Sequence, residues 1–388
     1  MRIISAKLLL LRIPLKHPFS HSLAVRHCTE SVAVQLTSDT GETGTGEGAP
    51  RAYVTGETTE SCLAHIRKVL LPDVFRHEFL DSNAHAAAAS LLDEINGLLP
   101  ATGHGGVIAF HAAKCAVELA LLDVTLKHAG RSLGDLLVPR RQSLVYSAVI
   151  GADTVATARK TAAECVRRGM RYFKVKVGHG DDYGRVAAVR ETAGAEASLR
   201  VDANGALSAT AAVALLHQLC PLDIKSIEQP VKRGDMAALV RVREDSPIPV
   251  MVDESLVTEP DAMALIEHHA CDIFNLRLSK NGGFGQTLRL AEIARAAGLG
   301  VQVGCQAGET AILAAAGRHL AAHLHEVEFL EGSYGRMLLD EDVSRVPVEF
   351  GYGGAAPLLQ GAGLGIELCR AALDKHSVTT IDTSATLL

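Results

Sequence analysis

The sequence predicts an α/β protein in which a parallel β/α barrel carries an α+β lobe at its amino-terminal side. Two observations favour this fold class. From residue 144 onward, short apolar runs alternate with amphipathic helical patterns, as in parallel strands joined by helices. Before residue 130, strand-like runs come first and helical patterns follow. A length of 388 residues accommodates both parts.

The composition excludes several classes of function. With 48% hydrophobic and 21% charged residues, the chain has the composition of a soluble globular protein. A net charge of −6, without a block of lysines and arginines, argues against a nucleic-acid partner and favours a small-molecule ligand. Lys7 and Arg12 interrupt the apolar start, and no run reaches the roughly 20 apolar residues of a membrane helix. We expect a cytoplasmic protein that binds neither membrane nor nucleic acid.

The amino-terminal part, residues 1–130, is expected to form an α+β capping domain that begins as a β-meander. Its apolar runs lie at 3–13, 31–37 and 43–49. The last two runs are separated by "TSDTGET", where Asp39 and Gly41 supply turn chemistry. Helical patterns follow near 58–71, 84–98 and 108–129.

Residues 131–335 are expected to form the barrel. The strands are predicted near 144–150, 171–177, 198–202, 225–228, 249–252, 272–276, 300–304 and 326–331. Helices fit between them, for example at 154–168, 208–219 and 284–298. Gly169 and Gly298 are expected to terminate the first and the last of these helices. The glycine-rich remainder, 336–388, lacks the strand–helix alternation, and we expect it to run back over the capping domain.

The eight cysteines do not indicate a zinc or redox centre, because none of them forms a C-x-x-C pair. Most are expected to be buried reduced thiols. Cys305, in "VGCQAGET", is a candidate for the substrate pocket. Even there a packed thiol is favoured over a nucleophile, since no activating partner is apparent.

Polar residues recur where five successive barrel strands end. They are Lys176 in "FKVKVG", Asp202 in "LRVDANGA", Glu228 in "SIEQP", Asp253 in "VMVDES" and Lys280 in "NLRLSKNGG". Neighbouring members are 25 to 27 residues apart, about one β/α unit. Because a barrel of this type carries its chemistry at the carboxyl ends of its strands, the five residues are predicted to share one site.

Three of these residues are acids from adjacent strands and indicate a metal site. Asp202, Glu228 and Asp253 would repel one another unless a cation lay among them. Oxygen ligands without histidine or cysteine favour Mg²⁺, with Mn²⁺ as the alternative, over Zn²⁺. Each acid taken alone is also explained as a helix cap, but three acids in register disfavour that interpretation.

Lysines flank the predicted metal site. Lys174 and Lys176 share one face of the strand before the acid strands, and Lys280 follows the strand after them. Lys176 and Lys280 are therefore placed to move a proton on either face of one carbon, with Lys174 tuning Lys176 and contacting the substrate carboxylate. A single lysine whose ammonium reaches solvent at the barrel rim is the alternative, but it does not account for two lysines beside three acids.

The combination of these charges predicts one kind of chemistry. Removing a proton from the carbon next to a carboxylate creates a dianionic enediolate. A divalent metal bound to the carboxylate oxygens stabilises that charge by several kcal/mol. We therefore expect an enzyme that abstracts the α-proton of a small carboxylate substrate.

At these residues the chain resembles the enolase superfamily, and within it the muconate lactonizing enzyme subgroup of the mandelate racemase/muconate lactonizing enzyme family. The resemblance covers essentially the whole chain, from the capping lobe through K-x-K and the three acids to the lysine of the sixth barrel strand. It implies a modified (β/α)7β TIM barrel, one Mg²⁺ and a lysine base. It also implies a substrate closed in by two loops of the amino-terminal lobe, here 16–27 and 49–57.

The substrate pocket is expected to be lined by Asn204, Glu254, Cys305, Gln306, Glu309, Glu331, Phe19, Arg26 and Tyr53. Dipeptide epimerases resemble one another in a D-x-D on the eighth strand that binds an ammonium group. This chain has Phe329, Leu330 and Glu331 there, so one carboxylate is missing. The stretch "EFLEGSYGRMLLDEDV" also resembles the end of the cycloisomerase barrel. The eighth strand therefore does not distinguish an epimerase from a cycloisomerase.

Among the reactions of the subgroup, we expect a racemase or epimerase of an amino-acid derivative, which is an N-acyl amino acid, a dipeptide or a proline derivative. Lysines on both faces permit two-sided proton exchange. A muconate-type cycloisomerase or a syn-dehydratase of the o-succinylbenzoate synthase kind is the alternative, with one lysine doing the proton transfer. A non-catalytic barrel that binds metal and carboxylate is the alternative from a different class. A homo-oligomer is expected.

Overall fold

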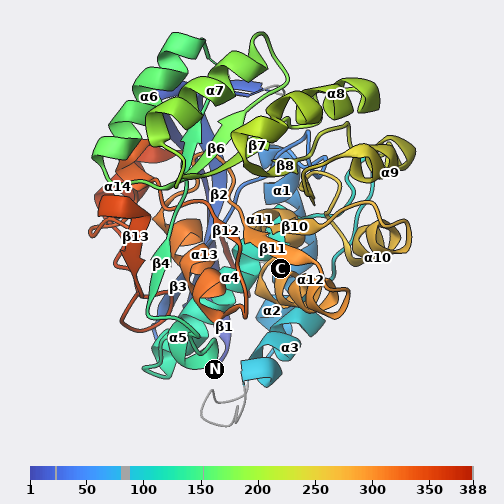
Figure 1. Cartoon of the computed structure of the whole chain (residues 1–388). Helices are drawn as coiled ribbons and strands as arrows, with labels where there is room; N and C mark the ends of the chain where they lie inside the picture. The colour runs from blue at the N-terminus through green and yellow to red at the C-terminus, as the bar shows by residue number, and fades with distance from the viewer. Residues whose placement is uncertain (22–23, 80–87, 152, 387–388) are drawn as a thin grey trace.

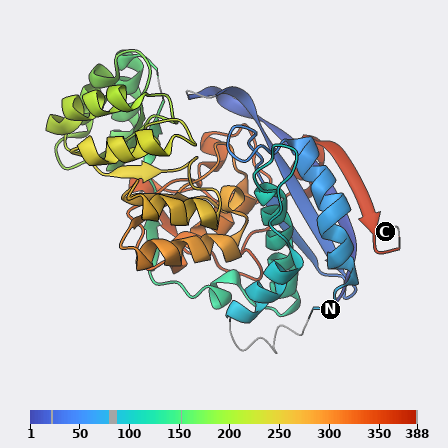
Figure 2. The same ribbon diagram turned by 90° about the vertical axis from the view of Figure 1, so that its right-hand side faces the viewer.

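The computed structural model describes residues 1–21, 24–79, 88–151 and 153–386. A capping sheet and a barrel lie side by side, as the two views show (Figure 1, Figure 2). The capping sheet is antiparallel, in the order β14–β1–β2–β3. Its strands are β1 (Ile3–His21), β2 (Ala24–Ser38), β3 (Thr43–Gly48) and β14 (Ser377–Ser384). The carboxyl-terminal strand therefore pairs with the first strand of the chain.

The sequence TGTGEG of β3 lets the helix α4 (His111–His128) lie directly on the sheet. A Cβ atom at Gly46 would fall 2.0 Å from the carbonyl oxygen of Ala116. One at Gly48 would fall 2.0 Å from that of Ala112. Only glycine permits so close an approach, and the alternate spacing puts the glycines on one face of the strand.

The predicted helix 58–71 is longer and interrupted. It runs as α1 (Thr59–His65), the π-helical turn η1 (Ile66–Leu70) and α2 (Leu71–Arg76). Helix α3 (Ala88–Leu98) follows, and residues 84–87 of its predicted range lie outside the described residues. α1 begins with a capping box on Thr58, which explains the position of its start.

The barrel has eight strands in the order β5 to β12, and every pair of neighbouring strands is parallel. The strands are β5 (Ala148–Ile150), β6 (Tyr172–Lys176), β7 (Ser198–Asp202), β8 (Ile224–Glu228), β9 (Val250–Val252), β10 (Ile273–Leu276), β11 (Gly300–Val303) and β12 (Phe329–Leu330). The amide of Ser147 donates to the carbonyl oxygen of Leu330 at 2.9 Å and so connects the last strand to the first. The predicted fold class is confirmed.

Helices connect consecutive barrel strands and surround the sheet, as Figure 1 shows. They are α6 (Val155–Arg167), α7 (Asp182–Ala193), α8 (Ala209–Leu219), α9 (Met236–Asp245), α10 (Glu259–Glu267), α12 (Phe284–Ala296) and α13 (Ala311–His323), with the short helix α11 (Leu278–Asn281) between β10 and α12. Gly169 and Gly298 follow α6 and α12 with φ of +76° and +71°. Glycine adopts this conformation without a Cβ penalty, so both helices end where the sequence predicts.

The predicted strand 144–150 is wrong as one element, because the chain divides between two sheets there. β4 (Ser143–Val145) pairs antiparallel with β13 (Ala355–Pro357), and only β5 enters the barrel. The amide of Tyr146, between the two strands, donates to the carbonyl oxygen of Gly354 at 2.9 Å. The remaining elements are α5 (Leu133–Leu136), η2 (Cys220–Leu222), η3 (Gly335–Met337), η4 (Tyr352–Gly354) and α14 (Arg370–His376).

The predicted loop 16–27 is wrong as a loop. β1 continues to His21 and β2 resumes at Ala24, and these two residues are paired across the strands. Backbone pairing between the strands therefore extends this segment into a hairpin arm; residues 22–23 lie outside the described residues. In the part of the chain that the structure describes, no helix combines the length and the apolar composition needed to cross a membrane.

Candidate active site

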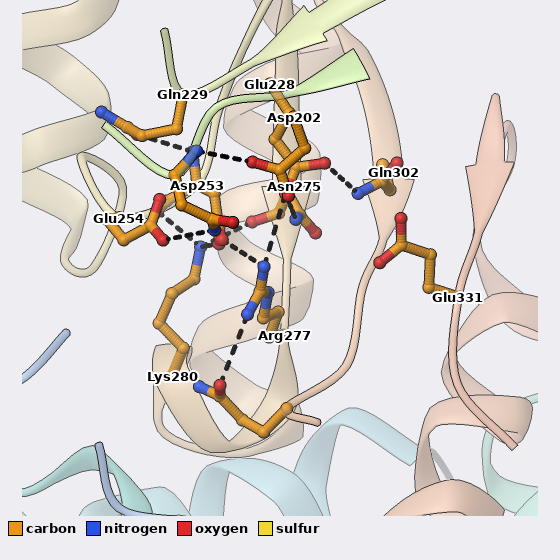
Figure 3. Close-up of polar contacts among 12 residues, drawn as sticks. Asp202, Glu228, Gln229, Asp253, Glu254, Asn275, Arg277, Lys280, Gln302 and Glu331 are labelled. Carbon is orange, nitrogen blue, oxygen red and sulfur yellow. Dashed lines mark hydrogen bonds and ion pairs between the residues drawn. The ribbon is translucent and has the colours of Figure 1, made fainter. Parts of the chain in front are cut away.

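Three buried acids lie together at the carboxyl ends of neighbouring barrel strands (Figure 3). Asp202 is the last residue of β7, Glu228 is the last residue of β8, and Asp253 directly follows β9. Asp202 and Glu228 are register partners in the parallel pair β7–β8. The sequence produces this cluster because each acid stands at the end of a largely buried strand of the same repeat.

Two cationic side chains lie between the three acids. The Lys174 ammonium is 2.8 Å from the Asp202 carboxylate and 2.9 Å from that of Glu228. The Arg277 guanidinium is 3.4 Å from Glu228 and forms a closer ion pair with Asp253. Burial opposes the charged form of Lys174, but the Asp202 and Glu228 carboxylates hold its pKa well above the usual range. These carboxylates therefore favour the charged form of Lys174.

Neutral amides fix the orientation of Glu228. The side-chain amide of Asn275 donates to its Oε1 at 2.9 Å, and that of Gln302 donates to its Oε2 at 3.1 Å. Burial, followed by the charge of Asp202, raises the pKa of Glu228. A carboxylate that is buried against another acid and held by rigid donors is preorganised to bind a cation.

Lys176 lies on the β7 side of the acids. Its ammonium is 2.7 Å from the Asp202 carboxylate and 2.6 Å from Oδ1 of Asn204. Asn204, in the left-handed region with φ of +44°, also donates to Glu254 at 3.1 Å. Burial, followed by the charge of Asp253, raises the pKa of Glu254 to about 7. The predicted pocket residues Asn204 and Glu254 are thus connected to the Lys176 end of the site.

Lys280 lies on the β9 side of the acids. It belongs to α11, and its ammonium donates to the Asp253 carboxylate at 2.9 Å and to the carbonyl oxygens of Asp253 and Asn275 at 2.8 and 2.7 Å. Burial lowers the pKa of Lys280. Lys176 is on β6 and Lys280 follows β10, four strands further around an eight-stranded barrel. The two ammonium groups therefore approach the acids from opposite flanks.

The donor set fits a hard divalent cation. Asp202, Glu228 and Asp253 offer only carboxylate oxygens, which Mg²⁺ prefers. Among the described residues, no group of three or more His, Cys, Asp or Glu side chains is arranged to hold a metal ion. Asp202 contacts Lys174, and Asp253 contacts Arg277. Both cations come from flexible side chains, and they identify where positive charge is stabilised between the acids.

The predicted pocket residues of the seventh strand end lie together. Cys305, Gln306 and Glu309 line a small cavity of about 10 Å³. Glu309 accepts from the amide of Gln306 at 2.6 Å, and the Gln306 side chain contacts Arg277 at 3.4 Å. Burial raises the pKa of Glu309 to about 8 and that of the Cys305 thiol well above its usual range. Cys305 is partly buried, and its raised pKa disfavours the thiolate form that a nucleophile requires.

Glu331, at the end of β12, is neutralised by two buried cations. Its Oε1 lies 2.5 Å from the Arg200 guanidinium and 3.1 Å from the Lys174 ammonium. Burial opposes ionisation, but these two charges lower the pKa of Glu331 to about 2. Arg200 also donates to Ser147 at 3.1 Å and lies 4.7 Å from the ring centre of Phe329. The Lys174 ammonium also donates to Oε2 at 3.2 Å, so both oxygens of Glu331 have cationic partners.

The capping-domain candidates are less directly connected to the acids. The Arg26 guanidinium lies 5.8 Å from the ring centre of Tyr53. The side chain of Phe19 lies outside the described part of the structure.

Sequence reasoning missed four residues of the site: Arg200, Asn275, Arg277 and Gln302. Each is a buried polar residue on or directly after a barrel strand. A signal was present, because a polar side chain inside an apolar strand requires a buried partner. Asn275 and Arg277 stand two residues apart in "NLRLSK", so their side chains share a face of the strand. They come just before Lys280, which the sequence did predict as a site residue.

Comparisons with known proteins identify the family. The family described as enolase C-terminal domain-like matches residues 157–372, and the mandelate racemase/muconate lactonizing enzyme N-terminal domain matches residues 3–137. The hydrophobic dipeptide epimerase of Enterococcus faecalis is 31% identical over 363 residues, which cover 92% of this chain and 96% of the relative.

Solved structures are similar over nearly the full length. The N-succinyl Arg/Lys racemase from Bacillus cereus matches with a TM-score of 0.87 at 27% identity, covering 99% of this chain and 100% of the other. A dipeptide epimerase from Enterococcus faecalis, complexed with Mg and the dipeptide L-Leu-L-Tyr, matches with a TM-score of 0.82 at 29% identity, covering 95% and 100%. Fold and site together define an isomerase of the enolase superfamily. The chain belongs to the mandelate racemase/muconate lactonizing enzyme family.

Proposed function

We propose that this enzyme racemises an N-acyl amino acid by removing the proton α to its carboxylate, with Mg²⁺ as cofactor. One observation carries the proposal: Lys176 and Lys280 reach the acid cluster from opposite flanks, through Asp202 and Asp253 respectively. A planar enediolate between two such amines can be reprotonated on either face, which is what racemisation requires.

The three lysines have different roles, which follow from their positions. Lys176 takes the α-proton of one enantiomer as a neutral amine, while Lys280 as an ammonium returns a proton on the other face. The opposite enantiomer uses the same pair in reverse. Lys174 does not transfer protons, because its three carboxylate neighbours keep it charged, and it holds positive charge near the substrate carboxylate.

The cofactor would be held by Asp202, Glu228 and Asp253. When bound, Mg²⁺ supplies positive charge to the substrate carboxylate as negative charge develops there. The Mg in the similar dipeptide epimerase structure supports Mg²⁺ as the cofactor. Asn275 and Gln302 keep the Glu228 carboxylate oriented as a metal ligand.

An N-acyl amino acid is preferred over a dipeptide with a free ammonium group because of Glu331. Arg200 and Lys174 already neutralise this carboxylate, so a substrate ammonium would have to displace a buried ion pair. An acylated nitrogen is neutral and avoids that cost. The similarity to N-succinyl Arg/Lys racemase over 99% of the chain supports the same class.

Exchange of the α-hydrogen in D₂O tests the proposal. The enzyme with Mg²⁺ would be incubated with single enantiomers of N-succinyl and N-acetyl amino acids, and with dipeptides and muconate for comparison. We expect deuterium in both enantiomers of the N-acyl substrates. A single labelled lactone from muconate, without exchange in any amino-acid derivative, would identify a cycloisomerase instead.

A further inference from the structure

We propose that His111 is a positioning residue for Lys280, so that the capping domain sets the place of the second lysine. The inference builds on the proposed function, in which Lys280 transfers a proton. His111 is the first residue of α4, and its Nδ1 lies 2.7 Å from the main-chain carbonyl oxygen of Lys280. This hydrogen bond joins the capping domain to the turn that carries the lysine.

The hydrogen bond determines the tautomer of the His111 ring. A carbonyl oxygen only accepts hydrogen bonds, so Nδ1 carries the hydrogen. Burial lowers the pKa of His111 to about 4, and the ring is neutral near pH 7. A neutral ring with its donor on Nδ1 can hold the Lys280 carbonyl without adding a charge beside the ammonium.

Lys280 depends on such contacts because it is not part of a barrel strand. β10 ends at Leu276, and the lysine lies in the single turn of α11. On the barrel side, the side-chain amide of Asn281 holds this turn by donating to the carbonyl oxygens of Leu256 and Val257 at 3.1 and 3.2 Å. These bonds anchor only one side of the turn.

The capping domain holds the other side at points before and after the lysine. The amide of Ala49 donates to Oγ of Ser279 at 2.8 Å. Glu118, two turns beyond His111 on α4, accepts from the amide of Gly285 at 3.1 Å and from that of Phe284. Together with His111, these contacts connect three points of the segment 279–285 to the capping domain.

The two glycines that follow the lysine in "KNGG" fit this contact. Gly282 and Gly283 have φ of +83° and +93°. A Cβ atom at Gly283 would fall 1.9 Å from Oε2 of Glu118, and one at Gly282 would fall 3.0 Å from Cδ2 of His111. A side chain at Gly283 would therefore have to displace the Glu118 carboxylate and would be strained at this positive φ.

Loss of the His111 hydrogen bond should affect one lysine and not the other. Lys176 lies in β6, which is bonded to a strand on each side, and it does not depend on α4. The turn that carries Lys280 would be free to shift, and a displacement of about 1 Å at a reacting group costs roughly 100-fold in rate. Proton transfer should therefore slow on one face of the substrate only.

The test compares His111→Leu with His111→Asn. Deuterium exchange in D₂O is measured separately from each enantiomer of an N-succinyl amino acid, and Lys280→Ala identifies the enantiomer that relies on Lys280. We expect His111→Leu to slow that enantiomer by at least about tenfold and to change the other by less than about twofold. His111→Asn retains a donor close to the Nδ1 position and should restore most of the rate.

His319 provides a matched control. It is also a buried histidine whose ring nitrogen contacts a main-chain carbonyl, that of Leu364 at 3.2 Å, and burial also lowers its pKa to about 4. His319→Leu should destabilise the protein without an asymmetric effect on exchange. If His111→Leu slows both enantiomers equally, or neither, the positioning role is wrong.

A second measurement does not need activity. Amide hydrogen exchange of the peptide 278–285, followed by mass spectrometry, should become faster in His111→Leu and stay unchanged in His319→Leu. Unchanged protection of this peptide in His111→Leu would overturn the inference. Faster amide exchange in an enzyme that does not exchange any substrate α-hydrogen would support the positioning contact and contradict the proposed function.

Discussion

Lys280 donates to Asp253 twice, to the carboxylate at 2.9 Å and to the main-chain carbonyl oxygen at 2.8 Å. The second lysine and the third acid are thus one structural unit, as Lys176 and Asp202 are on the other flank. The carboxylates that we propose as metal ligands therefore also orient the two lysine side chains. Changes to an acid should therefore alter both metal binding and proton transfer.

Asp253→Asn should weaken Mg²⁺ binding at least about tenfold, because one of three carboxylate ligands loses its charge. It should also slow exchange in the enantiomer that relies on Lys280 more than in the other. Titration calorimetry with Mg²⁺ and exchange from each enantiomer measure the two effects. Mg²⁺ affinity equal to that of the wild type would contradict the assignment of Asp253 as a ligand.

Removal of divalent metal should abolish α-hydrogen exchange, and added Mg²⁺ should restore it. Bound Mg²⁺ should also stabilise the fold, by about 2.7 kcal/mol at a concentration one hundred times its Kd. A thermal melt with EDTA and with excess Mg²⁺ checks this. The Glu228→Gln variant, which keeps the size of the side chain, should show a smaller shift. Full activity in EDTA would argue against a metal in this site.

Arg200→Met should destabilise the protein by about 3 to 5 kcal/mol, because it leaves the buried Glu331 carboxylate with one cationic partner fewer. The double variant Arg200→Met/Glu331→Gln should recover part of that loss. Urea unfolding of the two variants and the wild type gives the values. A single variant within 1 kcal/mol of the wild type would show that the pair does not stabilise the barrel.

The contribution of His319 to the free energy of unfolding should fall as the pH drops from 6.5 towards 4. Burial lowers the pKa of His319 to about 4, whereas the unfolded chain takes up this proton near 6.5. The unfolded state binds more protons in that interval, so acid favours it. Glu57 acts in the opposite sense, since burial raises its pKa to about 7 and its contribution is lost as the pH rises.

A variant isolates the histidine from this opposing carboxylate. His319→Asn should reduce the slope of unfolding free energy between pH 5 and 6 by up to about 1.4 kcal/mol per pH unit. Urea unfolding at several pH values measures the slope in both proteins. Identical slopes would mean that His319 is already protonated in the folded state.

The strand-end residues could be predicted because they follow the period of the barrel. Asp202, Glu228 and Asp253 each end an apolar run, and parallel strands bring such positions to one edge. Arg200 and Arg277 could not be placed in the same way. Their positions follow from partners, Glu331 and the acids, that are distant in sequence.

The two errors of the fold prediction have local causes. The run 144–150 has a continuous strand pattern, but Tyr146 bonds to Gly354 and divides it between two sheets. The loop at 16–27 is expected from the family resemblance. The pairing of β1 with β2 nevertheless extends through it to His21 and Ala24, because tertiary pairing outweighs local propensity.

The central claim is that Lys176 and Lys280 act on opposite faces of one carbon. The most direct measurement is α-hydrogen exchange in D₂O from each enantiomer of an N-succinyl amino acid, with Mg²⁺, in Lys176→Ala and Lys280→Ala. We predict complementary losses, so that each variant fails to exchange the enantiomer that the other still exchanges. Loss of the same enantiomer in both variants, or wild-type exchange in Lys176→Ala, would contradict the account.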